Sequence, residues 1–369
     1  MPSSTVSTRV LVLGAGKIGR LVTRLLADDG AFEVTVADAA APSAQAAART
    51  REGEPLERVT GRVVDFGDAR ALGEALKGHA YVVSCAPFHL NRTIAEAARE
   101  RAVHYLDLTE DVETTKLVRG LARGSERCFI PQCGLAPGFV SIVAAETARG
   151  FDVLDSVKLR VGALPLYPSN RLMYNLSWST EGLINEYGNP CEAVVDGQLV
   201  TTRPLEALES LSVDGIGYEA FNTSGGLGTL AESWAGRVAN LDYKSIRYPG
   251  HRELVAFLMR DLKFNEDRET LKRVLERSIP YAWQDVVLIF VGVSGHVKGR
   301  YTQESYVKKI YNDEVGGEPW SAIQITTASS VCTVLDLHLR GKLPARGFVR
   351  QEDIAFQDFI ESRFARPYL

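Results

Sequence analysis

The sequence predicts an α/β fold in which an N-terminal, doubly wound parallel sheet is followed by a second, α+β domain. Apolar strands alternate with helical patterns between residues 9 and 130, as expected for successive βαβ units. Farther along, apolar and polar residues alternate, which is typical of antiparallel strands. Because 369 residues are many for one hydrophobic core, we expect a first domain over 1–137, completed by about 322–369, and a second over 138–321.

The composition narrows the classes of function. With 24% charged residues and a net charge of −4, the chain has no basic excess that would favour a nucleic acid or a membrane surface as a partner. The first eight residues, MPSSTVST, do not resemble a signal peptide, and no run of eighteen apolar residues occurs, so a cytoplasmic protein is expected. The five cysteines and six histidines lack the spacings of disulfide frameworks and metal sites, so we expect neither.

A strand, a glycine-rich turn and a helix follow one another over residues 9–30. In a GxGxxG turn the first glycine forms the bend, the second lets the backbone approach a pyrophosphate, and the third lets the helix pack on the strand. The N–H groups at the start of the helix then face the phosphates. This pattern predicts a dinucleotide-binding Rossmann domain, with a glycine turn that binds no nucleotide as the alternative. The residues expected at the phosphates are Gly14, Gly16, Lys17, Ile18 and Gly19.

The next strand indicates which dinucleotide is bound. Residues 32–37 end at Asp38, whose carboxylate can accept hydrogen bonds from the two ribose hydroxyls. Three alanines follow, and no arginine is present there to receive a 2′-phosphate. The sequence therefore favours NAD over NADP.

The third and fourth strands should end at the same crevice, because ligands of doubly wound sheets lie beyond the carboxyl ends of the strands. Asp65 and Phe66 follow the third strand and are expected near the adenine end of the cofactor. A capping role for Asp65 or Asp68 at the helix over 69–76 is equally compatible. The residues expected to line the crevice after the fourth strand are Cys85, Ala86 and Pro87.

The fifth strand, in VHYLDLTED, turns at this edge too. Asp107 and Glu110 are therefore expected to point toward the crevice. The chain then reaches QCGLAPGF, whose glycines and proline favour a hinge out of the first domain. Cys133 lies in this hinge without a local base or cation, so a packed cysteine is favoured over a catalytic thiol.

The remaining elements are predicted from periodicity. Helices are expected at residues 42–51, 69–76, 91–101, 114–122, 139–149, 252–264, 267–278 and 322–340. Alternating stretches expected to form an antiparallel sheet in the second domain are 156–164, 172–180, 191–202, 285–295 and 305–312.

Two polar stretches of the second domain could contact a substrate. In the first, Tyr174 and Asn175 fall on opposite faces of an expected strand, and the polar face suits a ligand wall or, equally, a solvated surface. In the second, Thr223, Ser224 and Gly225 begin a glycine-rich loop whose N–H groups suit a carboxylate. A plain surface loop is the alternative for that segment.

A third stretch, LDYKSIRYPGH, contains Arg247 and His251. A guanidinium binds a carboxylate through two parallel hydrogen bonds, and the neighbouring tyrosines indicate that Arg247 is buried. His251 is a candidate proton carrier because imidazole titrates near neutral pH. Capping of the following helix is the alternative for His251.

Taken together, these segments resemble the saccharopine dehydrogenase family of amino-acid dehydrogenases. The matching segments, in the family's order, are VLGAGKIG, YLDLTED, GLAPGF, YNLSWSTEGLINEY, EAFNTSGG and YKSIRYPGH. The resemblance implies an N-terminal Rossmann domain, NAD(P)-linked oxidation at a carbon that bears nitrogen, and a second domain that binds substrate and forms a homodimer. Within the family, the chain is most similar to the lysine 6-dehydrogenase group.

For that group the expected reaction is the NAD-dependent oxidation of the ε-carbon of L-lysine to the semialdehyde, which cyclises to piperideine carboxylate, with release of ammonia. Asp107 or Glu110 would then attract the cationic end of the substrate, and Arg247 with the loop at 223–226 would hold its α-carboxylate. His251 would carry a proton. No metal is implied.

Two alternatives remain open at the level of sequence. One is a saccharopine dehydrogenase or reductase acting on a secondary amine, or on a related carboxylated polyamine or opine-type substrate. Its additional carboxylates could be met by Arg171, Lys244 and Arg247. The other is a binding protein that senses a nucleotide or metabolite, although no DNA-binding helix pair or interaction tail supports it.

Overall fold

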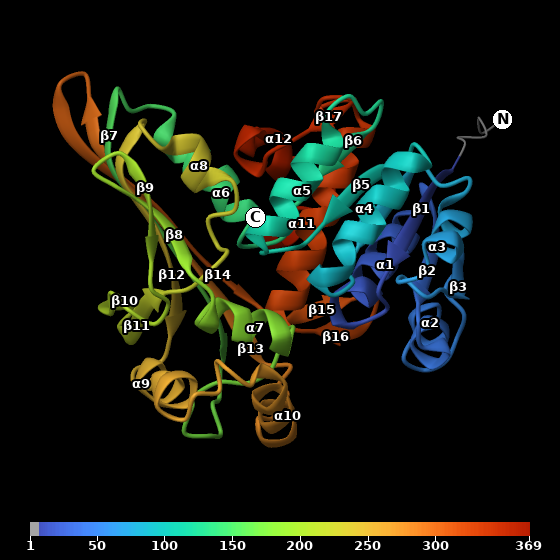
Figure 1. The fold of residues 1–369 in the computed structure, drawn as a ribbon, viewed down its shortest axis with the longest axis horizontal. Coiled ribbons are helices and arrows are strands. Elements are labelled where there is room, and N and C mark those ends of the chain that lie inside the picture. The colour runs from blue at the N-terminus through green and yellow to red at the C-terminus, as the bar shows by residue number, and fades with distance from the viewer. Residues whose placement is uncertain (1–6) are drawn as a thin grey trace. The chain divides into compact units, whose positions relative to one another are not determined.

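The chain is described over residues 7–369 by a computed structural model, and it divides into two compact units. The first unit contains residues up to Leu135 together with Glu314–Glu318 and Gln324–Leu369. The second contains Ala136–Asp313 and Pro319–Ile323. Each unit has its own sheet, and the predicted α/β class is confirmed (Figure 1).

The first unit is built on a seven-stranded sheet in the order β17-β6-β5-β4-β1-β2-β3, with every pairing parallel. The strand order reverses between β1 and β4, which is the point where doubly wound folds bind ligands. The last four residues of β1 are completely buried, as expected for a parallel strand covered on both faces. The strands are β1 (Thr8–Leu13), β2 (Phe32–Asp38), β3 (Val59–Val63), β4 (Tyr81–Ser84), β5 (His104–Asp107), β6 (Cys128–Ile130) and β17 (Gly347–Phe348).

Side chains cap the N-termini of α3 (Ala69–Leu76) and α5 (Val112–Ala122) in this unit. The Asp68 carboxylate accepts hydrogen bonds from the first N–H groups of α3, and Asp111 does the same for α5. Gly30 ends α1 with a φ of 80°, a conformation that favours glycine. The α-helices are α1 (Lys17–Asp29), α2 (Ala41–Ala47), α3 (Ala69–Leu76), α4 (Asn91–Glu100), α5 (Val112–Ala122), α11 (Ala322–Leu339) and α12 (Phe356–Ile360); the 3-10 helices are η1 (Phe88–Leu90), η3 (Gln351–Asp353) and η4 (Arg366–Tyr368).

The C-terminal segment completes the first sheet. β17, red in Figure 1, pairs in parallel with β6 and becomes the edge strand. Beyond it, the buried Gln351 amide donates a hydrogen bond of 2.8 Å to the Pro131 carbonyl. Residues more than 200 positions apart in the sequence therefore form one sheet edge.

The second unit contains a larger mixed sheet in the order β10-β11-β12-β7-β13-β14, and the β8–β9 hairpin pairs with β12. The sequence predicts an antiparallel sheet here. The prediction is only partly correct, because β12 runs parallel to β7. The strands are β7 (Val153–Pro165), β8 (Cys191–Val195), β9 (Gln198–Thr202), β10 (Glu209–Val213), β11 (Ile216–Asn222), β12 (Val238–Arg247), β13 (Asp285–Val297) and β14 (Arg300–Tyr311). β15 (Asp313–Val315) and β16 (Glu318–Trp320) form a separate two-stranded sheet.

The helices of the second unit are fewer. They are α6 (Phe139–Ala148), α7 (Thr180–Gly188), α8 (Leu230–Trp234), α9 (His251–Ala256), the π-helical turn η2 (Phe257–Asp261) and α10 (Arg268–Ser278). The helix expected over 252–264 is observed as far as Asp261, but its second half is π-helical, since the N–H of Leu262 bonds to the carbonyl of Phe257, five residues back. In the first unit, the helix expected over 42–51 ends early because Arg49 pairs with Pro55 in an isolated bridge.

The strand expected over residues 172–180 does not form. Met173 has a φ of 51°, which no strand permits, and the side-chain amide of Asn170 bonds to the Tyr174 carbonyl at 2.7 Å. The N–H of Leu176 donates to the carbonyl of Pro280 instead of to a sheet neighbour. Tyr174 and Asn175 are both buried, so the alternation does not separate a core face from a solvent face.

A pair of histidines in the first unit is expected to make the free energy of unfolding depend on pH. His104 on β5 and His338 on α11 have ring centroids 4.4 Å apart. Burial, with the charges of His338 and Arg127 adding to it, lowers the pKa of His104 to about 4, below its ordinary 6.5. The unfolded chain therefore binds a proton on this residue before the folded chain does, so stability should fall as pH drops from 6.5 toward 4.

We expect the melting temperature to decrease by about 5 °C or more across that pH interval. The His104→Asn variant retains an acceptor near Nδ1 for the N–H of Cys128, which lies 3.0 Å from it, but does not titrate. Thermal melts followed by circular dichroism should show a smaller pH dependence for this variant. Equal slopes for the variant and the wild type would contradict the assignment.

Within residues 7–369, no helix is long and apolar enough to cross a membrane. In the same part of the chain, no group of three or more histidine, cysteine or acidic side chains is placed to hold a metal ion.

Candidate functional site

The glycine-rich turn between β1 and α1 is closely packed at two of its three glycines. Gly14 has a φ of 97°, and a Cβ there would lie 2.6 Å from the Cys85 carbonyl oxygen. A Cβ on Gly19 would lie 1.8 Å from the carbonyl oxygen of Gly14. Both positions therefore require glycine for the turn itself, as the sequence predicts.

The middle glycine differs. Among residues 7–369, no atom beyond its two chain neighbours lies within 4 Å of a Cβ built on Gly16, and the residue is exposed. Gly16 is also the N-cap of α1 and has no side chain to cap that helix, whose first residues are Lys17 and Ile18. This is the arrangement that lets a pyrophosphate approach the backbone and the helix N-terminus, so the turn fits a dinucleotide.

Asp38 lies at the end of β2, where an acid is needed for ribose recognition. One carboxylate oxygen accepts a hydrogen bond of 2.8 Å from the N–H of Ala15, and the other accepts one of 2.9 Å from Ala40. The carboxylate is thereby fixed beside the glycine turn and remains half-buried. Ala39 and Ala40, which follow it, are exposed.

The residues expected after β3 and β4 have different surroundings. Asp65 accepts a hydrogen bond from the N–H of Gly67 at 2.9 Å, while Asp68 is the residue that caps α3. Phe66 is buried in the core of the first unit. After β4, Cys85 packs on the glycine turn through its carbonyl, and Ala86 is half-buried. Pro87 is exposed.

The sequence predicts that Asp107 points toward the crevice, but the structure places its side chain in the interior of the first unit. Its side chain is completely buried, and it accepts hydrogen bonds from the N–H groups of Thr109 and Gln132 and from the hydroxyl of Tyr105, at 3.0, 2.9 and 2.7 Å. Burial raises its pKa to about 6, and these three hydrogen bonds oppose the rise. The carboxylate joins β5 to the segment after β6, while Glu110 is half-buried.

Cys133 is likewise packed. Its thiol is buried and donates to the Ile130 carbonyl at 3.0 Å, and burial raises its pKa well above the ordinary value. These surroundings support the packed role that the sequence favours over a catalytic thiol.

In the second unit, the three polar stretches come together around Arg247. This arginine is 3% exposed, and it lies at the end of β12. Its Nε donates to the Tyr187 hydroxyl at 2.9 Å, and its Nη1 donates to the Ile246 carbonyl at 2.8 Å. Its Nη2 lies 3.5 Å from a carboxylate oxygen of Glu186. The burial expected for Arg247 is therefore correct.

The first polar stretch contributes Tyr174. The guanidinium carbon of Arg247 lies 5.0 Å from the centre of the Tyr174 ring, which is a cation–π arrangement. The indole N–H of Trp178 donates to the Tyr174 hydroxyl at 2.9 Å. Asn175 is buried next to it and accepts a hydrogen bond from Asn170 at 3.3 Å.

The second polar stretch contributes the loop that begins at Thr223. The Thr223 hydroxyl lies 2.8 Å from that of Ser245 on β12, and Ser245 in turn lies 3.5 Å from Glu186. The Ser224 hydroxyl donates to the Pro190 carbonyl at 2.8 Å. Gly225 has a φ of 87°, and at the next residue a Cβ built on Gly226 would lie 2.3 Å from a ring carbon of Tyr243.

His251, which the sequence predicts as a proton carrier, is buried at 1% exposure. Nδ1 lies 2.7 Å from the Leu172 carbonyl, and Nε2 lies 2.9 Å from the Tyr187 hydroxyl, so both ring nitrogens have partners. Burial, followed by the charge of Arg247, lowers its pKa to about 3. The imidazole is therefore neutral near pH 7.

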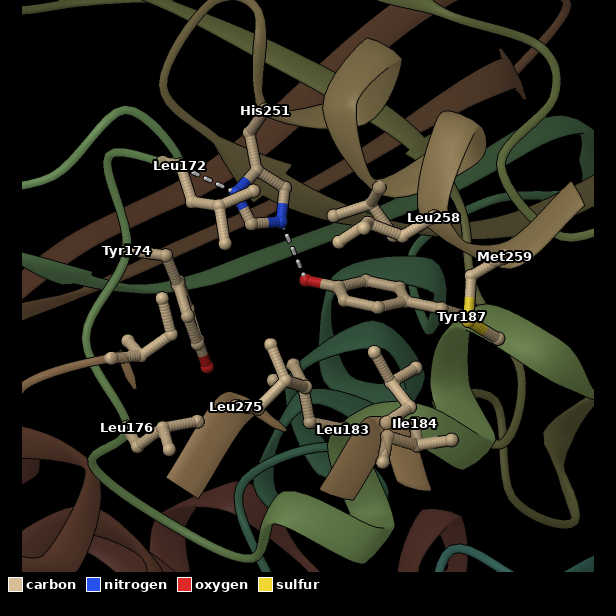
Figure 2. A pocket seen from close by; sticks show the side chains of 13 residues that line it. Leu172, Tyr174, Leu176, Leu183, Ile184, Tyr187, His251, Leu258, Met259 and Leu275 are labelled. Atoms are coloured by element: carbon tan, nitrogen blue, oxygen red, sulfur yellow. Dashed lines mark hydrogen bonds between the residues drawn. The ribbon is translucent and has the colours of Figure 1, made fainter. Parts of the chain in front are cut away.

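An apolar pocket adjoins these side chains. Figure 2 shows the ring of His251 and the hydroxyl of Tyr187 joined by a dashed line along one side, with Tyr174 beside them. The rest of the lining is aliphatic and comes mainly from α7 and α10 and the segment around α9. Because water has little access to such surroundings, the hydrogen bonds there are strong and their donors are well fixed.

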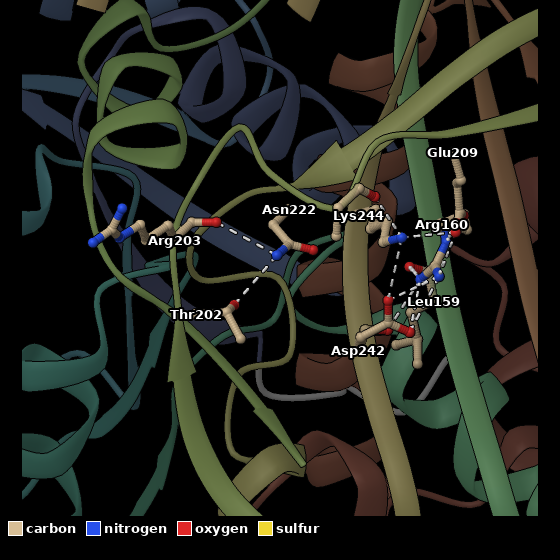
Figure 3. A network of polar contacts seen from close by, with 9 residues as sticks. Leu159, Arg160, Thr202, Arg203, Glu209, Asn222, Asp242 and Lys244 are labelled. Atoms are coloured by element: carbon tan, nitrogen blue, oxygen red, sulfur yellow. Dashed lines mark hydrogen bonds and ion pairs between the residues drawn. The ribbon is translucent and has the colours of Figure 1, made fainter. Parts of the chain in front are cut away.

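A separate ionic network occupies other charged residues of the second unit (Figure 3). Arg160 is almost completely buried and pairs with Asp242 at 2.9 Å and with Glu209. Lys244 pairs with Glu209 at 2.7 Å and donates to the Ala207 carbonyl at 2.7 Å. The two cations therefore neutralise the charges of Asp242 and Glu209. The ammonium group of Lys244 is held within this network.

Sequence reasoning did not single out Glu186, Tyr187 or Ser245. Tyr187 lies four residues after Leu183 on α7, a spacing that places both on one helix face. That spacing predicts burial, but it does not predict a partner 64 residues away at His251.

The parallel sheet, the glycine turn and the acid at the end of β2 define the first unit as an NAD(P)-binding Rossmann domain. Two family models cover most of the chain. One, described as the saccharopine dehydrogenase NADP binding domain, matches residues 10–127, and another, the saccharopine dehydrogenase C-terminal domain, matches residues 134–369. The chain belongs to the saccharopine dehydrogenase family, as its segments predict.

The curated relatives that match this chain have low sequence identity to it. The chain is similar to the mitochondrial alpha-aminoadipic semialdehyde synthase of Mus musculus, with 21% identity over 358 residues, covering 92% of this chain and 38% of the relative. It therefore spans well under half the length of such relatives. It is also 26% identical over 205 residues to a saccharopine dehydrogenase [NADP(+), L-glutamate-forming] of Saccharomyces cerevisiae, covering 52% of this chain and 43% of that protein.

Solved structures share the fold. The apo saccharopine dehydrogenase (L-Glu forming) of Saccharomyces cerevisiae superposes with a TM-score of 0.77 and 18% identity, covering 96% of this chain and 97% of that one. A homospermidine synthase of Legionella pneumophila in complex with NAD gives a TM-score of 0.64 and 14% identity, covering 98% and 90%. At these identities, the likeness shows the fold alone.

Proposed function

We propose that this protein is an NAD-dependent amino-acid dehydrogenase that oxidises the ε-carbon of L-lysine. The observation that carries the proposal is the buried guanidinium of Arg247, which lies where the three polar stretches of the second unit meet. A guanidinium offers five N–H groups, and the hydrogen bonds to Tyr187 and Ile246 engage two of them within the described residues. Its Nη2 also lies 3.5 Å from a carboxylate oxygen of Glu186, so in this proposal the substrate carboxylate shares or displaces that ion pair.

The reaction removes a hydride from the ε-carbon as the neutral amine becomes an iminium. Water then adds and ammonia leaves, which yields the aldehyde, and the aldehyde condenses with the α-amine to give the cyclic product. NAD, when bound, supplies the hydride acceptor. The residues that hold it in this proposal are Gly14, Gly16 and Gly19 at the phosphates and Asp38 at the ribose.

Arg247, with the loop at 223–226, orients the substrate through its α-carboxylate. The expected catalytic roles of Asp107 and His251 are not part of the proposal, because both side chains are buried and fully hydrogen-bonded. The amine must therefore be presented in its neutral form.

That requirement predicts the pH dependence of the reaction. A lysine ε-amine has a pKa of about 10.4 in water, so the neutral form becomes about tenfold more abundant with each pH unit between 7 and 9. We expect kcat/KM for lysine to rise steeply over that interval. Initial rates of NADH formation at 340 nm measure it, and a flat profile would contradict oxidation of the free neutral amine.

The direct test compares substrates and cofactors with purified protein. L-lysine, saccharopine and simple amines are each offered with NAD and with NADP, and the proposal expects turnover of lysine with NAD. NAD is proposed because exposed alanines follow Asp38 and leave no cation for a 2′-phosphate. Light scattering on the same sample tests the homodimer that the family resemblance implies.

The second candidate is a saccharopine-type dehydrogenase, which the names of the relatives favour. Its substrate carries three carboxylates and needs several cations. Within the second unit, Lys244 is paired with Glu209 at 2.7 Å and Arg171 is exposed. The pair of Arg247 with Glu186 is longer, at 3.5 Å, and for that reason Arg247 is the cation assigned to a carboxylate in this proposal. This count supports a substrate with one carboxylate, and turnover of saccharopine but not lysine would reverse the choice.

A further inference from the structure

A chain of hydrogen bonds leads from Arg247 into the apolar interior of the second unit. The Nε atom of Arg247 lies 2.9 Å from the hydroxyl of Tyr187, which lies 2.9 Å from Nε2 of His251. Nδ1 of His251 lies 2.7 Å from the carbonyl oxygen of Leu172. The last two contacts are the dashed lines in Figure 2.

The position of every hydrogen in this chain of hydrogen bonds follows from its two ends, the carbonyl of Leu172 and Nε of Arg247. The Leu172 carbonyl can only accept, so Nδ1 of His251 carries the hydrogen and Nε2 is the acceptor. The Tyr187 hydroxyl must then donate to Nε2. Its oxygen is left to accept from Nε of Arg247, which can only donate. No other assignment satisfies all three contacts with a neutral imidazole.

The same arginine is restrained on its remaining sides. Nη1 donates to the Ile246 carbonyl, and the Tyr174 ring faces the guanidinium at 5.0 Å. Tyr187 and His251 are themselves buried, at 5% and 1% exposure, so that neither can turn into solvent. The plane of the guanidinium is therefore fixed, with its Nη2 side toward Glu186.

We propose that Tyr187 and His251 are positioning residues that hold Arg247 in the orientation needed to bind a substrate carboxylate. The inference rests on the proposed function, in which Arg247 binds that carboxylate. Neither residue contacts the substrate in this scheme, and neither gains or loses a proton. Their effect is to fix a flexible side chain before binding, so that less entropy is lost when the carboxylate arrives.

The test is the kinetics of Tyr187→Phe with lysine and with 1,5-diaminopentane, which lacks the carboxylate. The variant keeps the ring and removes only the oxygen that accepts from Arg247. We expect KM for lysine to rise about tenfold, since a hydrogen bond to a charged group is lost, with kcat within about twofold and the diamine unaffected.

Two further variants separate positioning from packing. His251→Gln keeps an acceptor for the Tyr187 hydroxyl and should resemble the wild type more closely than His251→Leu does. In an Arg247→Lys background, which has no Nε donor of the same geometry, Tyr187→Phe should add nothing further. Equal effects of Tyr187→Phe on lysine and the diamine, or full additivity with Arg247→Lys, would overturn the proposal.

Arg247→Ala distinguishes failure of this inference from failure of the proposed function. If KM for lysine rises in Arg247→Ala but is unchanged in Tyr187→Phe, the positioning role is wrong and the carboxylate role of Arg247 stands. If KM is unchanged in both, the proposed function of Arg247 fails, and the positioning role fails with it. Should the wild type prefer another carboxylated amine, the same comparison applies with that substrate and its decarboxylated analogue.

Discussion

Replacing Gly16 by alanine is expected to weaken dinucleotide binding by about tenfold or more while leaving the fold intact. The backbone at this position has a φ of −76° and a ψ of −163°, which alanine adopts readily. A methyl group there meets no atom of residues 7–369 within 4 Å beyond its own chain neighbours. The methyl group is therefore expected to obstruct a ligand that approaches the backbone closely, and not the packing of the described residues. Fluorescence titration of NADH gives the affinity, and a thermal melt gives the stability.

Gly19→Ala is the matched control, because its methyl group would lie 1.8 Å from the Gly14 carbonyl. This variant should be destabilised by about 3 kcal/mol or more, since backbone atoms must move to accommodate it. The two glycines thus separate a ligand contact from a packing contact within one turn. Wild-type NADH affinity in Gly16→Ala would show that the turn does not bind the pyrophosphate.

Arg247→Ala is expected to reduce kcat/KM for lysine by a factor of about 100 to 1,000, which is the usual cost of losing one partner of a buried charged pair. Reaction of 1,5-diaminopentane, which has no carboxylate, should be slow in the wild type and little changed in the variant. Steady-state kinetics with both substrates measure the difference.

The variant also removes the partner of Glu186, so its folding must be verified by circular dichroism before the kinetics are interpreted. Arg247→Lys keeps the charge but not the planar fork, and it should fall between the wild type and Arg247→Ala. Normal affinity for lysine in Arg247→Ala would rule out the assignment of this residue to the α-carboxylate.

The first unit could be predicted in detail because its determinants are local. Strand, glycine turn and helix follow one another within residues 8–29, and the structure has β1 and α1 there. The acid at Asp38 comes directly after the next strand. Each step depends on neighbours in the sequence, so pattern and spacing were sufficient.

The second unit was harder to predict because its polar residues find partners far away in the sequence. Alternation over 172–180 suggested a strand, but the backbone bonds to an Asn170 side chain and to Pro280. The sequence predicts that His251 is a proton carrier, but its two ring nitrogens are hydrogen-bonded to the carbonyl of Leu172 and the hydroxyl of Tyr187. No local pattern encodes these pairings.

Asp107 shows the same limit in the first unit. Its position at the end of β5 was correctly predicted, since the strand ends there. The direction of its side chain was not predicted correctly, because the carboxylate accepts a hydrogen bond from the N–H of Gln132, 25 residues later, and points inward. The end of a strand can be inferred from sequence, whereas the orientation of the side chain at that end depends on which donors the next strand brings.

The edge position of β17 has a consequence for how the protein is made. The strand that completes the first sheet beside β6 is translated only after residues 136–313 have been synthesised. At ordinary synthesis rates the incomplete sheet waits for about 10 to 40 seconds with the edge of β6 unpaired. Until then, that edge can pair with other nascent chains, so slow elongation or early release of the polypeptide should increase the need for a chaperone at this edge.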